Sequence, residues 1–186
     1  MMLSGSTLEK WIKRSFNQAG RREDKMKKIR TIRTGGQSGA DRAAMDTAVR
    51  YHMPVCGWCP KGGWAEDYPI PPGLLADYPQ LMETPSEGTA QRTLWNMRDA
   101  DAILTVMPGG AESEGTDLGV GEGIRLRKPM YTAAGTEDVP GILAWLETLP
   151  DCLDLCVGGP RESEWPGIYR LTERVLDRVF RKLAGE

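Results

Sequence analysis

Histidine is nearly absent from the sequence: His52 is the single one among 186 residues. One imidazole excludes a metal centre built from several histidines, and it disfavours Ser-His-Asp and Cys-His catalytic arrangements. His52 stands near the expected end of a helix, where a positive charge is favourable. The sequence therefore argues against a histidine-dependent hydrolase.

Cysteine is also scarce, with four residues spaced as Cys56-x-x-Cys59 and Cys152-x3-Cys156. Four thiols could bind zinc. However, Cys152 and Cys156 lie in an apolar, strand-like run, where cysteine is commonly buried as a small hydrophobic residue. We therefore predict no metal site, and a reduced protein that needs no disulfide at this length.

Long apolar runs are missing as well. No stretch approaches the roughly 20 residues that a membrane helix requires, and the basic N-terminus lacks the apolar centre of a secretory signal. Hydrophobic residues make up 40% and charged residues 27% of the chain, as in ordinary globular proteins. These features predict a cytoplasmic protein with no membrane partner.

Charge is unevenly distributed. Residues 1–33 hold ten Lys and Arg against three Asp and Glu, whereas residues 34–186 hold fourteen against twenty-three. A basic arm can bind nucleic acid, but Met26 resembles a natural start that runs directly into a first strand. We therefore predict a dispensable basic extension over residues 1–25, a single domain over residues 26–186, and no nucleic-acid partner.

Hydrophobic patterns alternate between strand and helix. Strands are expected at residues 29–34, 55–56, 102–107, 130–133 and 152–157. Helices are expected at residues 40–52, 84–100, from about 116 to 127, 139–149 and 168–183. Such alternation predicts a Rossmann-like, three-layer α/β/α fold with a mostly parallel sheet, in which ligands bind at the carboxyl edge of the strands.

Three of the expected strand-to-helix turns are rich in glycine, namely residues 35–39, 109–116 and 158–163. Glycine lets a ligand approach the main chain closely, and the first turn of a helix offers unpaired N–H groups to an anion. Three such turns on one edge favour a phosphate or nucleotide site over three independent structural turns.

The first of these turns, "RTGGQSGADRAAMD", matches neither the P-loop nor the dinucleotide signature, so no ATPase is inferred. Gln37 and Ser38 can add side-chain hydrogen bonds, and Arg42 follows at the start of the helix. Asp41 is equally well explained as the cap of that helix.

Two further segments carry polar residues in a suggestive pattern. Arg92, Trp95, Asn96 and Asp99 share one helix face, which taken alone is a solvated surface. Residues 57–79 form a long loop in which four aromatic residues favour an ordered structure, and its Lys61, Glu66 and Asp67 suggest a lid over the site.

Several blocks together resemble the putative molybdenum carrier family: "GGQSGADRAAMDTA", "GWCPKGGWAED", "ETPSEGTAQRTLWNMRDADAILTV" and "GGPRESEWPGIY". That family is similar to the Rossmann-like group that contains the lysine-decarboxylase-like phosphoribohydrolases. The resemblance implies a homo-oligomer whose ligand is molybdenum cofactor, a pterin that carries an oxo-metal and a terminal phosphate. The ligand would be held rather than transformed, and an AMP-like nucleotide is the alternative.

The residues predicted to bind this ligand come from the glycine-rich turns and from the positions that match the family motifs. They are Gly35, Gly36, Gln37, Ser38, Gly39, Asp41, Arg42, Trp58, Lys61, Glu66, Asp67, Asn96, Arg98, Gly109, Gly110, Gly115, Thr116 and Arg161. No catalytic residue is predicted among them.

One departure bears on catalysis. The related phosphoribohydrolases carry a Pro-Gly-Gly-x-Gly-Thr-x-x-Glu motif, but here residues 111–114 separate the glycine pair from Gly115-Thr116. Gly119 occupies the place of the catalytic glutamate, and Glu122 follows three residues later. The alternative function, hydrolysis of a nucleoside 5′-monophosphate, would need a carboxylate from Glu112, Glu114 or Glu122.

Overall fold

A computed structural model describes residues 28–186 of the chain. Five parallel strands form the central sheet in the order β2-β1-β7-β5-β6. Their bounds are Ile29–Arg33 for β1, Val55–Cys56 for β2, Ala102–Val106 for β5, Met130–Ala133 for β6 and Leu153–Gly158 for β7. The predictions for residues 1–25 lie outside the described residues.

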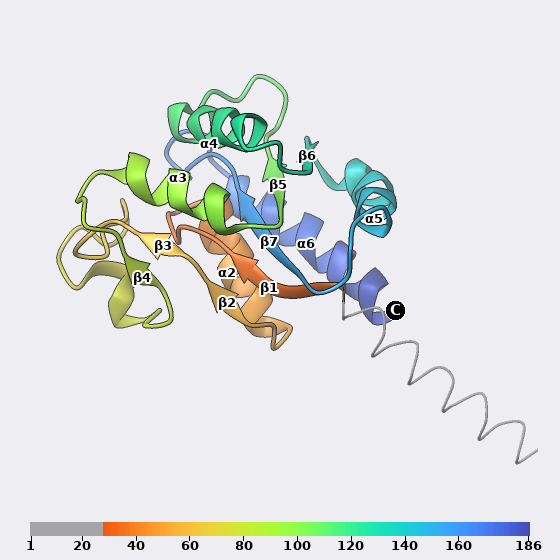
Figure 1. Ribbon diagram of the computed structural model, residues 1–186, viewed down its shortest axis with the longest axis horizontal. Coiled ribbons are helices and arrows are strands. Elements are labelled where there is room, and N and C mark those ends of the chain that lie inside the picture. The colour runs from red at the N-terminus through yellow and green to blue at the C-terminus, as the bar shows by residue number, and fades with distance from the viewer. Residues whose placement is uncertain (1–27) are drawn as a thin grey trace, which may run out of the picture.

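Helices cover both faces of this sheet (Figure 1). The larger core lies between the sheet and three helices, α2 (Ala40–Arg50), α5 (Val139–Glu147) and α6 (Ile168–Ala184). A smaller core lies on the other face, under α3 (Thr89–Asp99) and α4 (Glu114–Arg125). The structure confirms the predicted three-layer α/β fold.

The strands show why the sheet is buried on both faces. Every residue of β5 is buried, and a continuous apolar run is what a parallel strand between two helical layers requires. The long helix α6 buries Ile168, Val175, Val179 and Phe180 along one stripe, as expected for a helix packed against a sheet.

Strand order identifies where a ligand site is expected. If β7 and α6 preceded β1 in the chain, the order would become 3-2-1-4-5, which is the classic Rossmann order. The helices that follow β7 and β5 lie on opposite faces of the sheet. The crevice between the carboxyl ends of these two strands is therefore the topological switch point, where ligands bind in open α/β sheets.

Helix α4 packs closely against the sheet and against α3 because it has glycine at the two contact positions. A Cβ atom on Gly123 would lie 2.7 Å from Met130 Sδ and 2.8 Å from Ile103 Cδ1. One on Gly119 would contact Thr93 and Met97 of α3. Glycine lowers helix stability by about 1 kcal/mol relative to alanine, but here it lets α4 pack directly on β5, β6 and α3.

The segment between β2 and α3 is ordered. It contains a two-stranded parallel sheet, β3 (Trp58–Cys59) with β4 (Met82–Glu83), and a 3-10 turn, η1 (Gly73–Ala76). The Arg42 guanidinium carbon of α2 lies 4.8 Å from the ring centre of Tyr68 and 5.2 Å from that of Tyr78. Aromatic residues therefore anchor this segment to α2.

Helix α3 begins later than the sequence predicts, at Thr89 instead of Thr84. The Thr84 hydroxyl donates to the carbonyl of Cys59 at 3.2 Å and to that of Ser86 at 3.1 Å. The Ser86 N–H donates to Gln91 Oε1 at 2.9 Å. These side chains hold residues 84–88 in a turn that follows β4. Over residues 28–186, no helix has the length and apolar character needed to cross a membrane.

Gly39 joins the first turn to the loop after β7, and we predict that it tolerates no side chain. Its φ is +74°, and a Cβ atom would lie 2.6 Å from both Glu162 N and Pro160 O. Gly39→Ala is expected to destabilise the protein by about 3 kcal/mol, from backbone strain plus this clash.

Gly110 is the matched control, because its φ is +82° but no atom lies within 4 Å of the added Cβ. Gly110→Ala should cost only about 1 kcal/mol from the left-handed backbone. Urea unfolding of both variants measures the difference, and equal losses would contradict close packing at Gly39.

Candidate functional site

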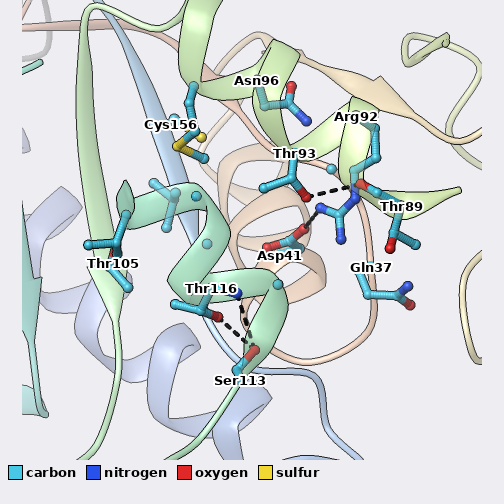
Figure 2. Close-up of a pocket in the computed structure, with 18 of the residues that line it drawn as sticks. Gln37, Asp41, Thr89, Arg92, Thr93, Asn96, Thr105, Ser113, Thr116 and Cys156 are labelled. Atoms are coloured by element: carbon cyan, nitrogen blue, oxygen red, sulfur yellow. Dashed lines mark hydrogen bonds and ion pairs between the residues drawn. The ribbon is translucent and has the colours of Figure 1, made fainter. Parts of the chain in front are cut away.

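A cleft opens at the switch point between β5 and β7 (Figure 2). Its walls come from the first glycine-rich turn, one face of α3, the start of α4 and the turn after β7. Seven residues predicted for the site line this cleft: Gly35, Gln37, Asp41, Asn96, Gly115, Thr116 and Arg161. The topology thus brings together residues from all three glycine-rich turns.

A buried ion pair crosses one end of the cleft. Figure 2 shows Arg92 reaching from α3 to Asp41 at the start of α2, and its Nη1 lies 2.9 Å from Asp41 Oδ2. The side chains are only 11% and 9% exposed. Burial raises the pKa of Asp41, and Arg92 together with the main chain of Gln37 and Gly35 opposes that shift.

The first turn therefore surrounds a carboxylate of its own chain. Asp41 does not cap α2, since the N-cap residue is Gly39 and the N–H of Ala40 donates to the carbonyl of Pro160 at 3.2 Å. A Cβ atom on Gly35 would lie 2.0 Å from Arg92 Nη1. The glycine at position 35 is what lets the arginine reach this turn.

Gln37 is buried with one half of its amide unpaired. Its Oε1 accepts from the N–H of Ser38 at 3.0 Å and from the N–H of Glu66 at 2.8 Å. Its Nε2 has no acceptor in the described part of the chain, and neither does Arg92 Nε. Both residues line the cleft, so two buried donors without a partner belong to its wall.

The start of α4 forms the opposite wall. The Ser113 hydroxyl caps the helix by accepting from the Thr116 N–H at 3.3 Å and from the Thr116 hydroxyl at 2.9 Å (Figure 2). The first turn of a helix leaves N–H groups without a helical partner, and its dipole favours an anion. Glu114 and Asp117 in the same turn reduce that positive potential.

Arg161 lines the cleft and lies in the turn that follows β7. Its main-chain N–H donates to Glu164 Oε2 at 2.8 Å, while its Nε is 4.0 Å from Glu164 Oε1. The side chain is 32% exposed, and its guanidinium carbon lies 6.0 Å from the ring centre of Trp64. Within residues 28–186 the guanidinium of Arg161 therefore makes one long ion pair and no hydrogen bond, which leaves its donors for a ligand.

Other residues predicted for the site hold the long segment in place. Arg42 donates to both carboxylate oxygens of Asp67, at 2.9 and 3.2 Å, and to the carbonyl of Gly36 at 3.0 Å. A Cβ atom on Gly36 would meet Leu81 at 2.9 Å. Arg42, Asp67 and Gly36 thus face the packing between the first turn and this segment, and they do not line the cleft.

Glu66 ties the same segment to both the first turn and the turn after β7. It accepts hydrogen bonds from the Ser38 hydroxyl and, at 2.6 Å, from the Ser163 hydroxyl. Burial alone would raise the pKa of Glu66, but the hydrogen bonds from Ser163 and Ser38 outweigh it and hold the pKa below its usual value.

The hydrogen bonds of Glu66 predict that the segment between β2 and α3 becomes less ordered in acid. Because its pKa is lowered in the folded state, its contribution to stability is present above the ordinary value near 4.5 and is lost as pH falls through the folded-state pKa. Proteolysis at Lys61 should accelerate across that window in the parent protein. The Glu66→Gln variant should be cut faster at neutral pH, and its cleavage rate should depend less on pH in acid. A cleavage rate with the same pH dependence as in the parent would contradict the role of the Glu66 hydrogen bonds.

Asn96 and Trp58 form a second structural contact. Asn96 Oδ1 accepts from the Trp58 N–H, and its Nδ2 donates to the Trp58 carbonyl, both at 2.9 Å. Trp58 also donates from Nε1 to Asp99 at 2.7 Å and packs edge-on against Trp95. The polar face of α3 is therefore largely covered, which corrects its interpretation as a solvated surface.

The remaining predicted site residues lie away from the cleft. Arg98 is exposed and pairs with Asp99. Gly109 and Gly110 are exposed, with nothing within 4 Å of a Cβ atom at either position. Lys61 lines a separate hollow beside the cleft.

The carboxylates considered for catalysis are not in the cleft. Glu122 is paired with Arg125 at 2.7 Å, and neither Glu112 nor Glu114 lines it. The carboxylates that do line it, Asp41 and Glu164, are bound to Arg92 and to the main chain of Arg161. The carboxylates that the alternative function would need therefore do not line this cleft.

The set of residues predicted to bind the ligand lacked several that complete the cleft. They are Thr89, Arg92, Thr93, Met97, Ile103, Thr105, Ser113, Gly119, Val120, Cys156, Val157, Gly158, Gly159 and Glu164. Arg92 and Gly158 match the family motifs, and Ser113, Gly158 and Gly159 lie in the predicted glycine-rich turns, so the sequence indicated their neighbourhood without assigning them to the site. Thr93 and Thr105 lie within a helix and a strand and have no local signature.

Metal-ligating groups do not gather in the described residues, where no cluster of three or more His, Cys, Asp or Glu side chains could hold an ion. Cys156 lines the cleft, but burial raises the pKa of its thiol strongly. A protonated, buried thiol is a poor ligand for a metal.

The fold and the position of the cleft define a Rossmann-like protein with a cleft at its switch point. Comparison with known proteins agrees. The family model "Circularly permutated YpsA SLOG family" matches residues 32–180, so the chain belongs to the circularly permutated YpsA SLOG family. The permutation is visible in the sheet, since β7 occupies the central place of a first Rossmann strand while coming last in the chain.

A solved structure extends the comparison. The chain is similar to the crystal structure of a protein named putative molybdenum carrier protein from Syntrophus aciditrophicus SB, with 32% sequence identity and a TM-score of 0.72. The match covers 82% of this chain and 94% of that one. No match was found among the curated proteins.

Proposed function

We propose that the protein binds and holds a small phosphate-bearing, nucleotide-like ligand at the switch-point cleft, with molybdenum cofactor as the first choice. The observation that carries this proposal is that two of the six buried side-chain atoms without a partner in residues 28–186, Gln37 Nε2 and Arg92 Nε, belong to residues that line the cleft. Leaving a buried donor unpaired costs about 1–3 kcal/mol. Oxygen atoms of an anionic ligand would supply the missing acceptors.

The size of the cleft supports a phosphate at its inner end. Its volume is about 50 Å³, which is well below the roughly 300 Å³ of ordinary small-molecule sites. A phosphate group fits such a space, but a whole nucleotide does not. The rest of the ligand would therefore project from the mouth of the cleft, past Arg161.

Molybdenum cofactor fits the residues present through its organic part. Arg161 and the start of α4 offer donors to a terminal phosphate. The described residues offer no cluster of metal ligands, so the oxo-metal would keep its dithiolene as its only anchor. This suits a carrier, which must release its cargo intact. The resemblance to the protein named putative molybdenum carrier protein supports the choice of molybdenum cofactor. We also propose that the protein is a homo-oligomer.

Arg161 provides the test of the proposed function. Arg161→Gln is expected to weaken binding of AMP and of a pterin phosphate by at least tenfold, or about 1.4 kcal/mol, because guanidinium presents paired donors to phosphate. Its side chain is partly exposed, so the melting temperature should not change.

Arg161→Lys is the matched control, since it keeps the charge but loses the paired donors. Its affinity should fall between those of the parent and the glutamine variant. Titration calorimetry measures the affinities, and a parallel assay should detect no release of ribose 5-phosphate from AMP. Equal affinity in all three proteins would overturn the proposal.

A further inference from the structure

We infer that the hollow beside the cleft is the subsite for the ring of the ligand, and that this ring presents adjacent N–H donors. This edge belongs to the 2-amino-4-oxopyrimidine group, which pterins and guanine share and adenine lacks. The inference rests on the proposed function, because it assigns the second half of the same ligand.

The hollow adjoins the cleft directly. Thr89 lines both of them. Arg161 lines the cleft, and its guanidinium lies over Trp64, which lines the hollow. A ligand whose phosphate lies in the cleft therefore extends across Thr89 and Arg161 into the hollow.

The volumes and the linings of the two spaces differ in the way this division requires. The cleft holds about 50 Å³ and the hollow about 750 Å³. Trp64, Pro69 and Pro71 give the hollow an apolar wall. An indole beside two prolines offers a flat surface for a planar ring, and stacking on tryptophan does not depend on which ring it is.

Two carboxylates at the hollow provide the selectivity. Glu83 and Glu87 both line it, and Glu83 already accepts from the N–H of Gly62. Glu87 is exposed, and within residues 28–186 it makes no hydrogen bond or ion pair. An ionised carboxylate only accepts hydrogen bonds.

A carboxylate therefore pairs with two neighbouring N–H donors, as in the guanine or pterin edge. Adenine sets an amino donor beside a ring nitrogen acceptor, so the second carboxylate oxygen would face a lone pair. Glu87 should consequently favour a guanine or pterin ring over adenine, although their sugar phosphates are alike.

Calorimetry on the full chain with three probes tests this inference: GMP, AMP and ribose 5-phosphate. We expect GMP to bind at least tenfold more tightly than AMP. Glu87→Gln should bring the affinity for GMP close to that for AMP and leave ribose 5-phosphate unaffected. Trp64→Leu should weaken both nucleotides at least fivefold, again without affecting ribose 5-phosphate.

Glu112→Gln is the matched control, because Glu112 is exposed and lines neither space. Equal binding of GMP and AMP, or a GMP affinity that neither Trp64→Leu nor Glu87→Gln changes, would overturn this inference alone. Failure of all three probes to bind at millimolar concentration would overturn the proposed function and the inference with it.

Discussion

Replacing Arg92 by methionine should destabilise the protein by about 3–5 kcal/mol, the cost of leaving one charge of a buried pair without its partner. Arg92 Nη1 lies 2.9 Å from Asp41 Oδ2, and both side chains are almost fully buried. The Asp41 carboxylate would then face the first turn with only main-chain donors.

The double variant Asp41→Leu/Arg92→Met distinguishes a lost pair from a lost side chain. Replacing a whole buried ion pair by apolar residues of similar size is often neutral, so the double variant should recover most of the stability lost by Arg92→Met. It should still fail to bind AMP, because Arg92 Nε is one of the donors assigned to the ligand. A double variant as unstable as the single one would contradict the ion-pair account.

Acid should partly rescue Arg92→Met. Burial raises the folded-state pKa of Asp41 above its ordinary value near 3.8, so the folded protein binds this proton more tightly than the unfolded chain. The stability that this protonation contributes is fully present below the ordinary pKa of an aspartate, and it is lost as pH rises through the folded-state pKa of Asp41. Without Arg92 the raised pKa rises further, so urea unfolding should show a smaller deficit at pH 4.5 than at pH 7.5.

Asn96→Leu should cost about 2–6 kcal/mol, because it leaves the N–H and the carbonyl of Trp58, both in partly buried hydrogen bonds, without partners at about 1–3 kcal/mol each. Asn96 is 1% exposed, and leucine has a similar size, so little of the loss should come from a cavity. The damage should concentrate at β3 and β4, where hydrogen exchange should accelerate most.

Asp99→Asn is the comparison for Asn96→Leu, since an asparagine still accepts from Trp58 Nε1 and the position is partly exposed. Its cost should stay below about 1 kcal/mol, as is usual for partly exposed ion pairs. Similar losses of stability in the two variants would show that the hydrogen bonds between Asn96 and Trp58 contribute no more than the partly exposed ion pair of Asp99 with Arg98.

The fold was predictable because its elements carry local signals. A buried strand was expected at residues 102–107 and is found at Ala102–Val106, since five consecutive apolar or β-branched residues suit a parallel strand. The final helix was expected at residues 168–183 and is found at Ile168–Ala184. Both follow from the spacing of apolar residues along the chain, which can be read from the sequence directly.

The arginines show why the site was harder to predict. Arg42 and Arg92 both lie near the start of a helix that borders the glycine-rich turns. The structure turns Arg42 away, between Tyr68 and Tyr78, and brings Arg92 to Asp41. Which arginine enters the cleft depends on contacts between residues 51 positions apart, and no local pattern records them.

The glycines give the same lesson in the first turn. Gly35 and Gly36 are neighbours with equal local signals. A Cβ atom on Gly35 would meet Arg92 in the cleft, whereas one on Gly36 would meet Leu81 in the packing beneath the turn. The sequence indicates that this turn needs bare backbone, but only the packing shows which side each glycine leaves open.

The most direct test of the central claim is native mass spectrometry of the protein purified from its own cells, with phosphorus and molybdenum measured on the same sample. The account predicts a bound small molecule that contains phosphorus, with molybdenum in equal amount if the cargo is molybdenum cofactor. Arg161→Gln purified in parallel should have lost it. A protein that carries no phosphorus-containing ligand, or an Arg161→Gln variant as fully loaded as the parent, would contradict the account.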